Sequence, residues 1–156
     1  MKTIPFTERE IELATELNKR GIIWKPKSSD WFIDLNSHRV LYNGDIVQSV
    51  SLCLVLDEDG RGFSFLELII DGEENGNRMK KSMSYSDRDK MSLMNWLPTI
   101  KDCIDIIGRT DEYEFHSLSK ENDLFKAAVT RISDKKTLSI TDKSEIEALY
   151  TLILNL

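Results

Sequence analysis

Trp24-Lys-Pro-Lys-Ser-Ser-Asp30-Trp31-Phe32-Ile33-Asp34-Leu35 opens the region, residues 24–70, that decides the fold. Apolar residues in this region alternate with polar ones or form a short run at 52–56, and Asn-Gly, Asp-Gly and Gly-x-Gly breaks separate the segments. Such a pattern is typical of neighbouring strands in an antiparallel sheet. After an entry into the sheet at 22–24, we expect strands at 31–35, 39–42, 47–56 and 63–70, although the last segment also fits a short helix.

Three amphipathic segments can cover the apolar face of this sheet. Thr7 and Glu10 have the spacing of a capping box, Thr99 with Asp102 can cap a second helix, and Thr141-Asp142 can cap a third. The sequence therefore predicts helices near the following residues: 8–20, 99–107 and 142–156.

The remaining segments are predicted as a loop and a second pair of strands. Residues 71–90 combine glycines with clustered charge and are interpreted as a mobile loop. Residues 112–118 and 125–132 resemble an antiparallel pair around 119–123, and 125–132 also fits a helix. We predict a single α+β domain spanning residues 1–156, in which a mostly antiparallel sheet is flanked by two to three helices.

Charge and hydropathy restrict the classes of partner. The chain of 156 residues carries 21 Lys and Arg against 27 Asp and Glu, a net charge of −6. That charge repels phosphate backbones and anionic lipid, so nucleic acid and membrane surfaces are disfavoured. No apolar run approaches the roughly 18 residues of a membrane span, and the N-terminus has no apolar signal core. We therefore expect a cytoplasmic protein.

Catalytic and cofactor motifs are incomplete. Cys53 and Cys103 lie too far apart in sequence for a local redox pair or zinc knuckle, and we expect two buried, reduced thiols. No phosphate-binding loop or nucleophile elbow is present, so the sequence predicts no cofactor and no metal. His38 and His116 are the only histidines. A small hydrolase or other enzyme that uses either one with carboxylates remains an alternative.

Two tryptophans close to lysines have two possible interpretations, as core residues or as part of a binding surface. Trp24, Trp31, Lys25 and Lys27 combine aromatic rings with cations, as stacking platforms for single-stranded nucleic acid do. Tryptophans at sheet positions are more often core residues, and the negative net charge opposes the stacking role. We therefore favour the core interpretation.

Acidic residues concentrate in two short segments. Residues 57–76 hold seven acids and one base, a balance of 1 − 7 = −6 that equals the net charge of the whole chain. The spacing does not match a calcium-binding loop, and solvated turns are the better interpretation. Because acidic patches steer basic partners, we predict that the protein binds another, possibly basic, protein. The predicted binding residues are Asp57, Glu58, Asp59, Asp71, Glu73 and Glu74.

Four short islands resemble small uncharacterised proteins of bacteriophages and prophages of Gram-positive bacteria. They are Trp24-x-Pro26, Asp30-Trp31-Phe32, Trp96-Leu97-Pro98 with the following helix, and Glu145-Ile-Glu-Ala-Leu149. That group tends to have Gly before the Asp-Trp pair, where this chain has Ser29, a difference that bears on the turn. The resemblance implies an intracellular, phage-associated accessory protein and transfers no catalytic residue. An inhibitor of a toxin or of host defence would be a special case of such a binding protein.

Overall fold

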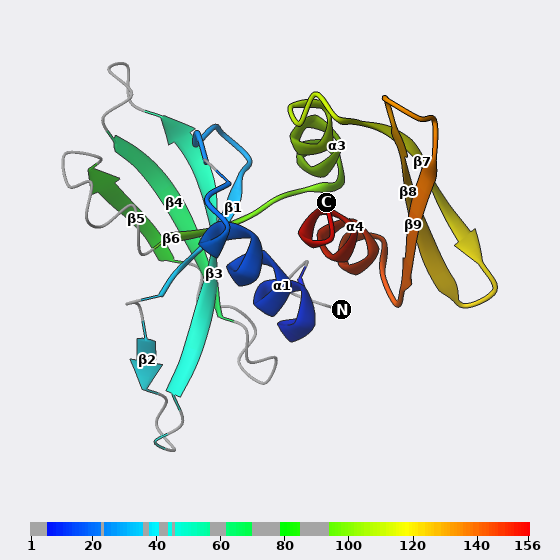
Figure 1. The fold of residues 1–156 in the computed structure, drawn as a ribbon. Coiled ribbons are helices and arrows are strands. Elements are labelled where there is room, and N and C mark those ends of the chain that lie inside the picture. Colours follow the sequence, from blue (N-terminus) through cyan, green and yellow to red (C-terminus); the bar gives the residue numbers. More distant parts are fainter. Residues whose placement is uncertain are drawn as a thin grey trace. The chain divides into compact units, whose positions relative to one another are not determined.

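The chain folds as an α+β protein, as predicted, with helices and antiparallel strands (Figure 1). This computed structural model describes residues 6–22, 24–35, 38–40, 44, 46–56, 62–69, 79–84 and 94–156. Contacts divide the chain into two compact units, unit 1 (Met1–Thr7 and Ile23–Leu97) and unit 2 (Glu8–Ile22 and Pro98–Leu156). The division does not fall within residues 71–90, and the first helix belongs with the C-terminal half. The single domain stays a prediction.

Unit 1 is built on one antiparallel sheet of six strands. The central path runs β5-β4-β3-β1-β6, and β2 pairs with β3 off that path. Its strands are β1 (Trp31–Asp34), β2 (His38–Val40), β3 (Ile46–Leu56), β4 (Gly62–Ile69), β5 (Met79–Ser84) and β6 (Met94–Leu97).

The four strands predicted at residues 31–70 are confirmed within a residue or two. β4 is a strand rather than a helix, because β3 and β5 pair with its two sides and satisfy its backbone. Gly44 has φ 88 between β2 and β3, the conformation expected of an Asn-Gly hairpin turn. The expected entry at 22–24 is wrong, since Ile22 and Trp24 lie outside any strand. Trp24 is instead held by side-chain contacts with Phe32 and Asp30.

The interpretation of residues 71–90 as one loop is also wrong for residues 79–84, which form β5. This strand is rich in Lys and Ser, residues that β-propensity disfavours, and its pairing with β4 decides its conformation. β5 lies at the end of the strand order, where charged residues such as Lys80 and Lys81 are common because they discourage edge-to-edge association. β6, which was not predicted, pairs with β1.

Unit 2 consists of a three-stranded antiparallel sheet, in the order β7-β8-β9, and three helices. α4 packs against β8 and β9 and contacts both other helices, while α3 packs against β7 (Figure 1). Its elements are α1 (Glu8–Lys19), α3 (Ile100–Gly108), β7 (Tyr113–Glu121), β8 (Leu124–Arg131), β9 (Thr137–Asp142) and α4 (Glu145–Leu154).

The predicted helices are confirmed, with one change in capping. Gly21, at φ 84, follows α1, and the Thr99–Asp102 capping box precedes α3. The prediction that Thr141-Asp142 caps α4 is wrong, because these residues pair with β8 as part of β9. Ser144 is the N-cap, and its hydroxyl accepts a hydrogen bond from the amide of Glu147 at 3.0 Å. The capping box at the start of α1 stays a prediction.

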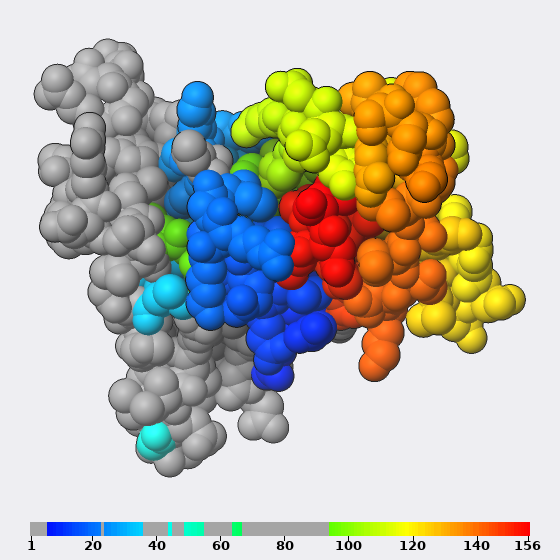
Figure 2. Space-filling view, viewed as in Figure 1, coloured from blue at the N-terminus to red at the C-terminus, as the bar shows by residue number. Residues whose placement is uncertain are grey.

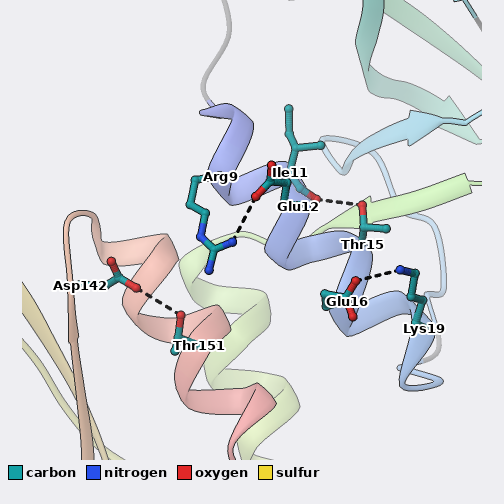
Figure 3. Close-up of polar contacts among 8 residues, drawn as sticks. All are labelled: Arg9, Ile11, Glu12, Thr15, Glu16, Lys19, Asp142 and Thr151. Atoms are coloured by element: carbon teal, nitrogen blue, oxygen red, sulfur yellow. Dashed lines mark hydrogen bonds and ion pairs between the residues drawn. The ribbon is translucent and has the colours of Figure 1, made fainter.

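Figure 3 shows polar contacts within α1 and a contact between the end of β9 and α4. On α1, Arg9 pairs with Glu12 at 3.1 Å and Lys19 pairs with Glu16 at 2.8 Å. These exposed pairs are each worth only a few tenths of a kcal/mol. The Asp142 carboxylate at the end of β9 accepts a hydrogen bond from Thr151 Oγ1 at 3.3 Å, which links the strand to α4.

The predicted pair at 112–132 is confirmed as the β7–β8 hairpin, and residues 124–131 form a strand rather than a helix. The connection is shorter than predicted, because the strands extend to a turn at Asn122 and Asp123, with Asn122 at φ 57. Alternate residues of β8, among them Ala127 and Val129, are fully buried under α4 together with Leu149 and Tyr150. This layer forms the core of unit 2.

Candidate functional site

The two cysteines are buried and unpaired, as predicted. Burial, and secondarily the charge of Asp30, raises the pKa of Cys53 to about 11. Burial and the nearby Asp102 likewise raise the pKa of Cys103. A nucleophilic cysteine needs the thiolate near neutral pH. Both thiols therefore have the properties of structural residues.

The two histidines do not assemble a catalytic group within the described residues. His116 is exposed in β7 at a register shift between Phe115 and Ser117, and its Nδ1 lies 3.4 Å from Thr130 Oγ1. Among the described side chains no carboxylate hydrogen-bonds its ring, although a nucleophile–base pair needs such a third group for orientation. His38 lies in β2, and its side chain is outside the described residues.

Trp24 and Trp31 are half-buried and pack on neighbouring rings of unit 1, which agrees with the core interpretation favoured from the sequence. Trp24 packs on Phe32 with ring centroids 5.2 Å apart, and Trp31 meets Phe6 edge-on at 6.0 Å. The Trp24 indole N–H donates to the carboxylate of Asp30 at 2.8 Å. Both indole rings are thus engaged in aromatic packing within unit 1.

Asp30 organises this cluster. Its side chain is buried and also accepts a hydrogen bond from the amide of Lys27 at 2.9 Å. The backbones of Asp30 and Ser29 then exchange hydrogen bonds of 2.8 Å with Cys53 in β3. Ser29 adopts φ 76, the left-handed conformation that favours glycine. The turn before Asp30 therefore has a backbone conformation that glycine adopts more readily than serine.

The six predicted partner-binding residues, Asp57, Glu58, Asp59, Asp71, Glu73 and Glu74, lie outside the described residues. The strands between which they occur are nevertheless defined. Residues 57–61 connect β3 to β4, and residues 70–78 connect β4 to β5. The two acidic segments are therefore attached to opposite ends of β4. The eight residues of this strand span about 24 Å, at about 3.4 Å for each step.

Unit 2 contains a buried polar group that sequence reasoning missed. Tyr150 is fully buried in α4, and its hydroxyl donates a hydrogen bond of 2.5 Å to the carbonyl of Pro98. The Ser144 hydroxyl donates to Glu10 Oε1 at 2.6 Å and so joins α4 to α1. Buried polar atoms require such partners, and these contacts fix the helices relative to each other. They involve residues distant in sequence, which no local motif marks.

β9 is a surface feature that sequence reasoning also missed. Thr137, Ser139 and Thr141 are exposed, whereas Leu138 and Ile140 are half-buried toward α4. Figure 2 shows the segment that contains this strand, in orange, at the surface of the molecule. The alternation is a strand signal of period two, which the interpretation of Thr141-Asp142 as a helix cap obscured.

The described part of the chain contains no group of three or more His, Cys, Asp or Glu side chains that could hold a metal ion. No helix among the described residues is both long and apolar enough to cross a bilayer. No protein-family model matches the sequence, and neither a curated protein nor a solved structure shows significant similarity to it.

Proposed function

We propose that the protein acts by binding a basic protein partner through the acidic segments 57–59 and 71–74. The observation that carries the proposal is the charge of residues 57–76, which equals the net charge of the whole chain. The described cysteines, tryptophans and Asp30 serve the core, and this supports a binding role over a catalytic one. The resemblance of four sequence islands to phage and prophage proteins fits an accessory protein of this kind.

The strand order sharpens the proposal. β4 pairs with β3 on one side and with β5 on the other, so the attachment points of the two acidic segments are fixed about 24 Å apart. This distance exceeds the Debye length of about 8 Å at physiological salt, so charges at the two attachment points would be screened from each other. We expect a partner that engages both segments to carry two basic patches.

The test uses the full-length chain to capture partners from a lysate of the native host. Three variants are compared: Asp57, Glu58 and Asp59 to Ser; Asp71, Glu73 and Glu74 to Ser; and, as a control with the same change of charge, Asp105, Glu112 and Asp123 to Ser. The control residues are exposed in unit 2. We expect one or both acidic variants, and not the control, to lose the partner.

Calorimetric titration of the captured protein then measures its affinity at two salt concentrations. Loss of an electrostatic site should weaken binding about tenfold and should reduce the dependence on salt. Capture that is equal for all three variants, or the absence of any partner, would contradict the proposal.

A further inference from the structure

We propose that two copies of this chain associate through β9, which would join their three-stranded sheets into one continuous antiparallel sheet. The inference is independent of the acidic segments. It rests on the open edge of β9, on the lack of the features that usually protect such edges, and on the self-complementarity of its sequence.

The backbone of β9 has one paired and one open side. Its even-numbered residues face β8, since the carbonyl of Lys136 accepts a hydrogen bond of 2.8 Å from the amide of Arg131 and the register continues without a shift. In an antiparallel ladder, alternate residues direct both backbone groups to the same side. Thr137, Ser139 and Thr141 therefore direct their N–H and C=O groups to the open edge, where no described strand pairs with them.

Two of the other edge strands, β7 and β5, carry features that protect an edge. β7 carries a register shift at His116 and the charged residues Glu114, Lys120 and Glu121, and β5 carries two lysines. Bulges and charges of this kind discourage strand addition. β9 has a regular ladder with β8, and its residues 137–141 include no charge, proline or glycine. β9 thus lacks the features that protect β7 and β5, and its edge can accept a further strand.

The sequence of β9 is complementary to itself about Ser139. An antiparallel second copy with Ser139 opposite Ser139 places Thr137 opposite Thr141 on the outer face and Leu138 opposite Ile140 on the inner face. Cross-strand Thr–Thr and aliphatic pairs are favourable. At both ends Lys136 comes opposite Asp142, which adds opposite charges. A twofold axis through Ser139 therefore produces an isologous interface, the usual form of a homodimer.

Sedimentation of the full-length chain at increasing concentration tests the association. We expect a monomer–dimer equilibrium. Ser139→Asp should weaken the dimer at least tenfold, because two carboxylates come directly opposite each other across the axis. Ser119→Asp is the matched control, an exposed serine in β7 of the same sheet, and should leave the equilibrium unchanged. A chain that remains monomeric at high concentration, or a dimer that is indifferent to Ser139→Asp, would overturn the proposal.

Cysteine cross-linking tests the register. Directly opposite residues that exchange hydrogen bonds have Cα atoms about 5.5 Å apart, within the range of a disulfide. Oxidised Ser139→Cys should therefore form a covalent dimer. Thr137→Cys should not, because its copies lie about four residues, or roughly 14 Å, apart along the strands. The native thiols are buried and do not compete. Equal cross-linking of both variants would contradict the register about Ser139.

Discussion

Units 1 and 2 each bury a thiol beside a carboxylate. The carboxylate of unit 1 stabilises a turn that contacts a strand, and the carboxylate of unit 2 stabilises a helix cap. In unit 1, Asp30 lies near Cys53 and accepts hydrogen bonds from Trp24 and Lys27, while its backbone bonds to β3. In unit 2, Asp102 lies next to Cys103 and accepts hydrogen bonds from the amide and hydroxyl of Thr99 in the same helical turn.

The difference lies in the range of the contacts. The backbone of Asp30 bonds to a strand more than twenty residues away while its carboxylate holds Trp24 and Lys27, whereas the carboxylate of Asp102 satisfies donors three residues away. Loss of a long-range junction releases two chain segments, and loss of a local cap frays one helix end. We therefore expect similar chemical changes at the two carboxylates to have unequal consequences.

Asp30→Ala should have the largest effect. It leaves the indole N–H of Trp24 and the amide of Lys27 without this acceptor in a partly buried site, and each lost hydrogen bond to a charged group is worth about 1.5–3 kcal/mol. We expect the free energy of unfolding to fall by about 3–4 kcal/mol in urea titrations. Hydrogen exchange should rise across β3 but not in α4.

Asp105→Ala, on the exposed surface of α3, is the control for Asp30→Ala and should change stability by less than about 0.5 kcal/mol. If the two variants were equally stable, Asp30 would not organise unit 1, and the contrast with Asp102 would fail.

Alkaline pH should destabilise both units through their thiols. The pKa of Cys53 is raised from 9.0 to about 11 in the folded state, so between these values the unfolded chain loses a proton that the folded chain keeps. Stability is therefore full below pH 9 and falls as pH rises, by about 1.4 kcal/mol per pH unit for this thiol. Cys103 and Tyr150, whose pKa values are also raised by burial, extend the loss to higher pH.

Cys53→Ala distinguishes the contribution of Cys53 to this pH dependence from that of Cys103. Urea titrations between pH 8 and 11 give the free energy of unfolding as a function of pH. This free energy should fall less steeply with pH for the variant than for the unchanged chain, by a difference of up to one proton released on unfolding. Hydrogen exchange should show that the remaining alkaline loss lies in unit 2. A slope that the substitution does not change would mean that Cys53 titrates alike in the folded and unfolded chains.

Asp102→Ala should have a smaller effect than Asp30→Ala, because the donors that lose this acceptor belong only to the helix cap, whereas the Asp30 carboxylate positions a turn whose backbone bonds to β3. The capping box contributes about 1–2 kcal/mol, and Asp102→Asn should retain part of it because the amide oxygen can still accept. Amide exchange should increase in residues 99–103 and remain unchanged in β3. A loss as large as that of Asp30→Ala would show that contact range does not separate the two sites.

The same contrast explains what the sequence could predict. Helix bounds, the Thr99–Asp102 cap and the hairpin strands follow from residues a few positions apart, and these predictions are confirmed. β5 and the junction at Asp30 depend on partners elsewhere in the chain, and local patterns did not reveal them. β9 carried a clear alternation, but Thr141-Asp142 also has the composition of a helix cap. The six acidic residues proposed to bind a partner lie outside the described residues, so their role rests on charge alone.

Ser29→Gly should have the smallest effect and the opposite sign. A non-glycine residue at positive φ costs about 1–2 kcal/mol, which the substitution by glycine removes. Part of that stabilisation is lost again, because glycine adds conformational entropy to the unfolded chain. Since Ser29 has φ 76, we expect the variant to gain about 0.5–1 kcal/mol, measured as a higher urea midpoint. Its amide can still donate to the carbonyl of Cys53, so the junction is preserved.

Ser28→Gly is the matched control, because Ser28 is not among the described residues with positive φ and should gain nothing. If Ser29→Gly failed to exceed it, the turn before Asp30 would not carry the strain that its backbone indicates. A gain in stability confined to Ser29→Gly would instead show that unit 1 has backbone strain at the turn before Asp30. The helix cap of unit 2 has no such strain, since Thr99 has φ −75. Relief of a left-handed backbone beside a buried carboxylate would then be the physical reason for the gain.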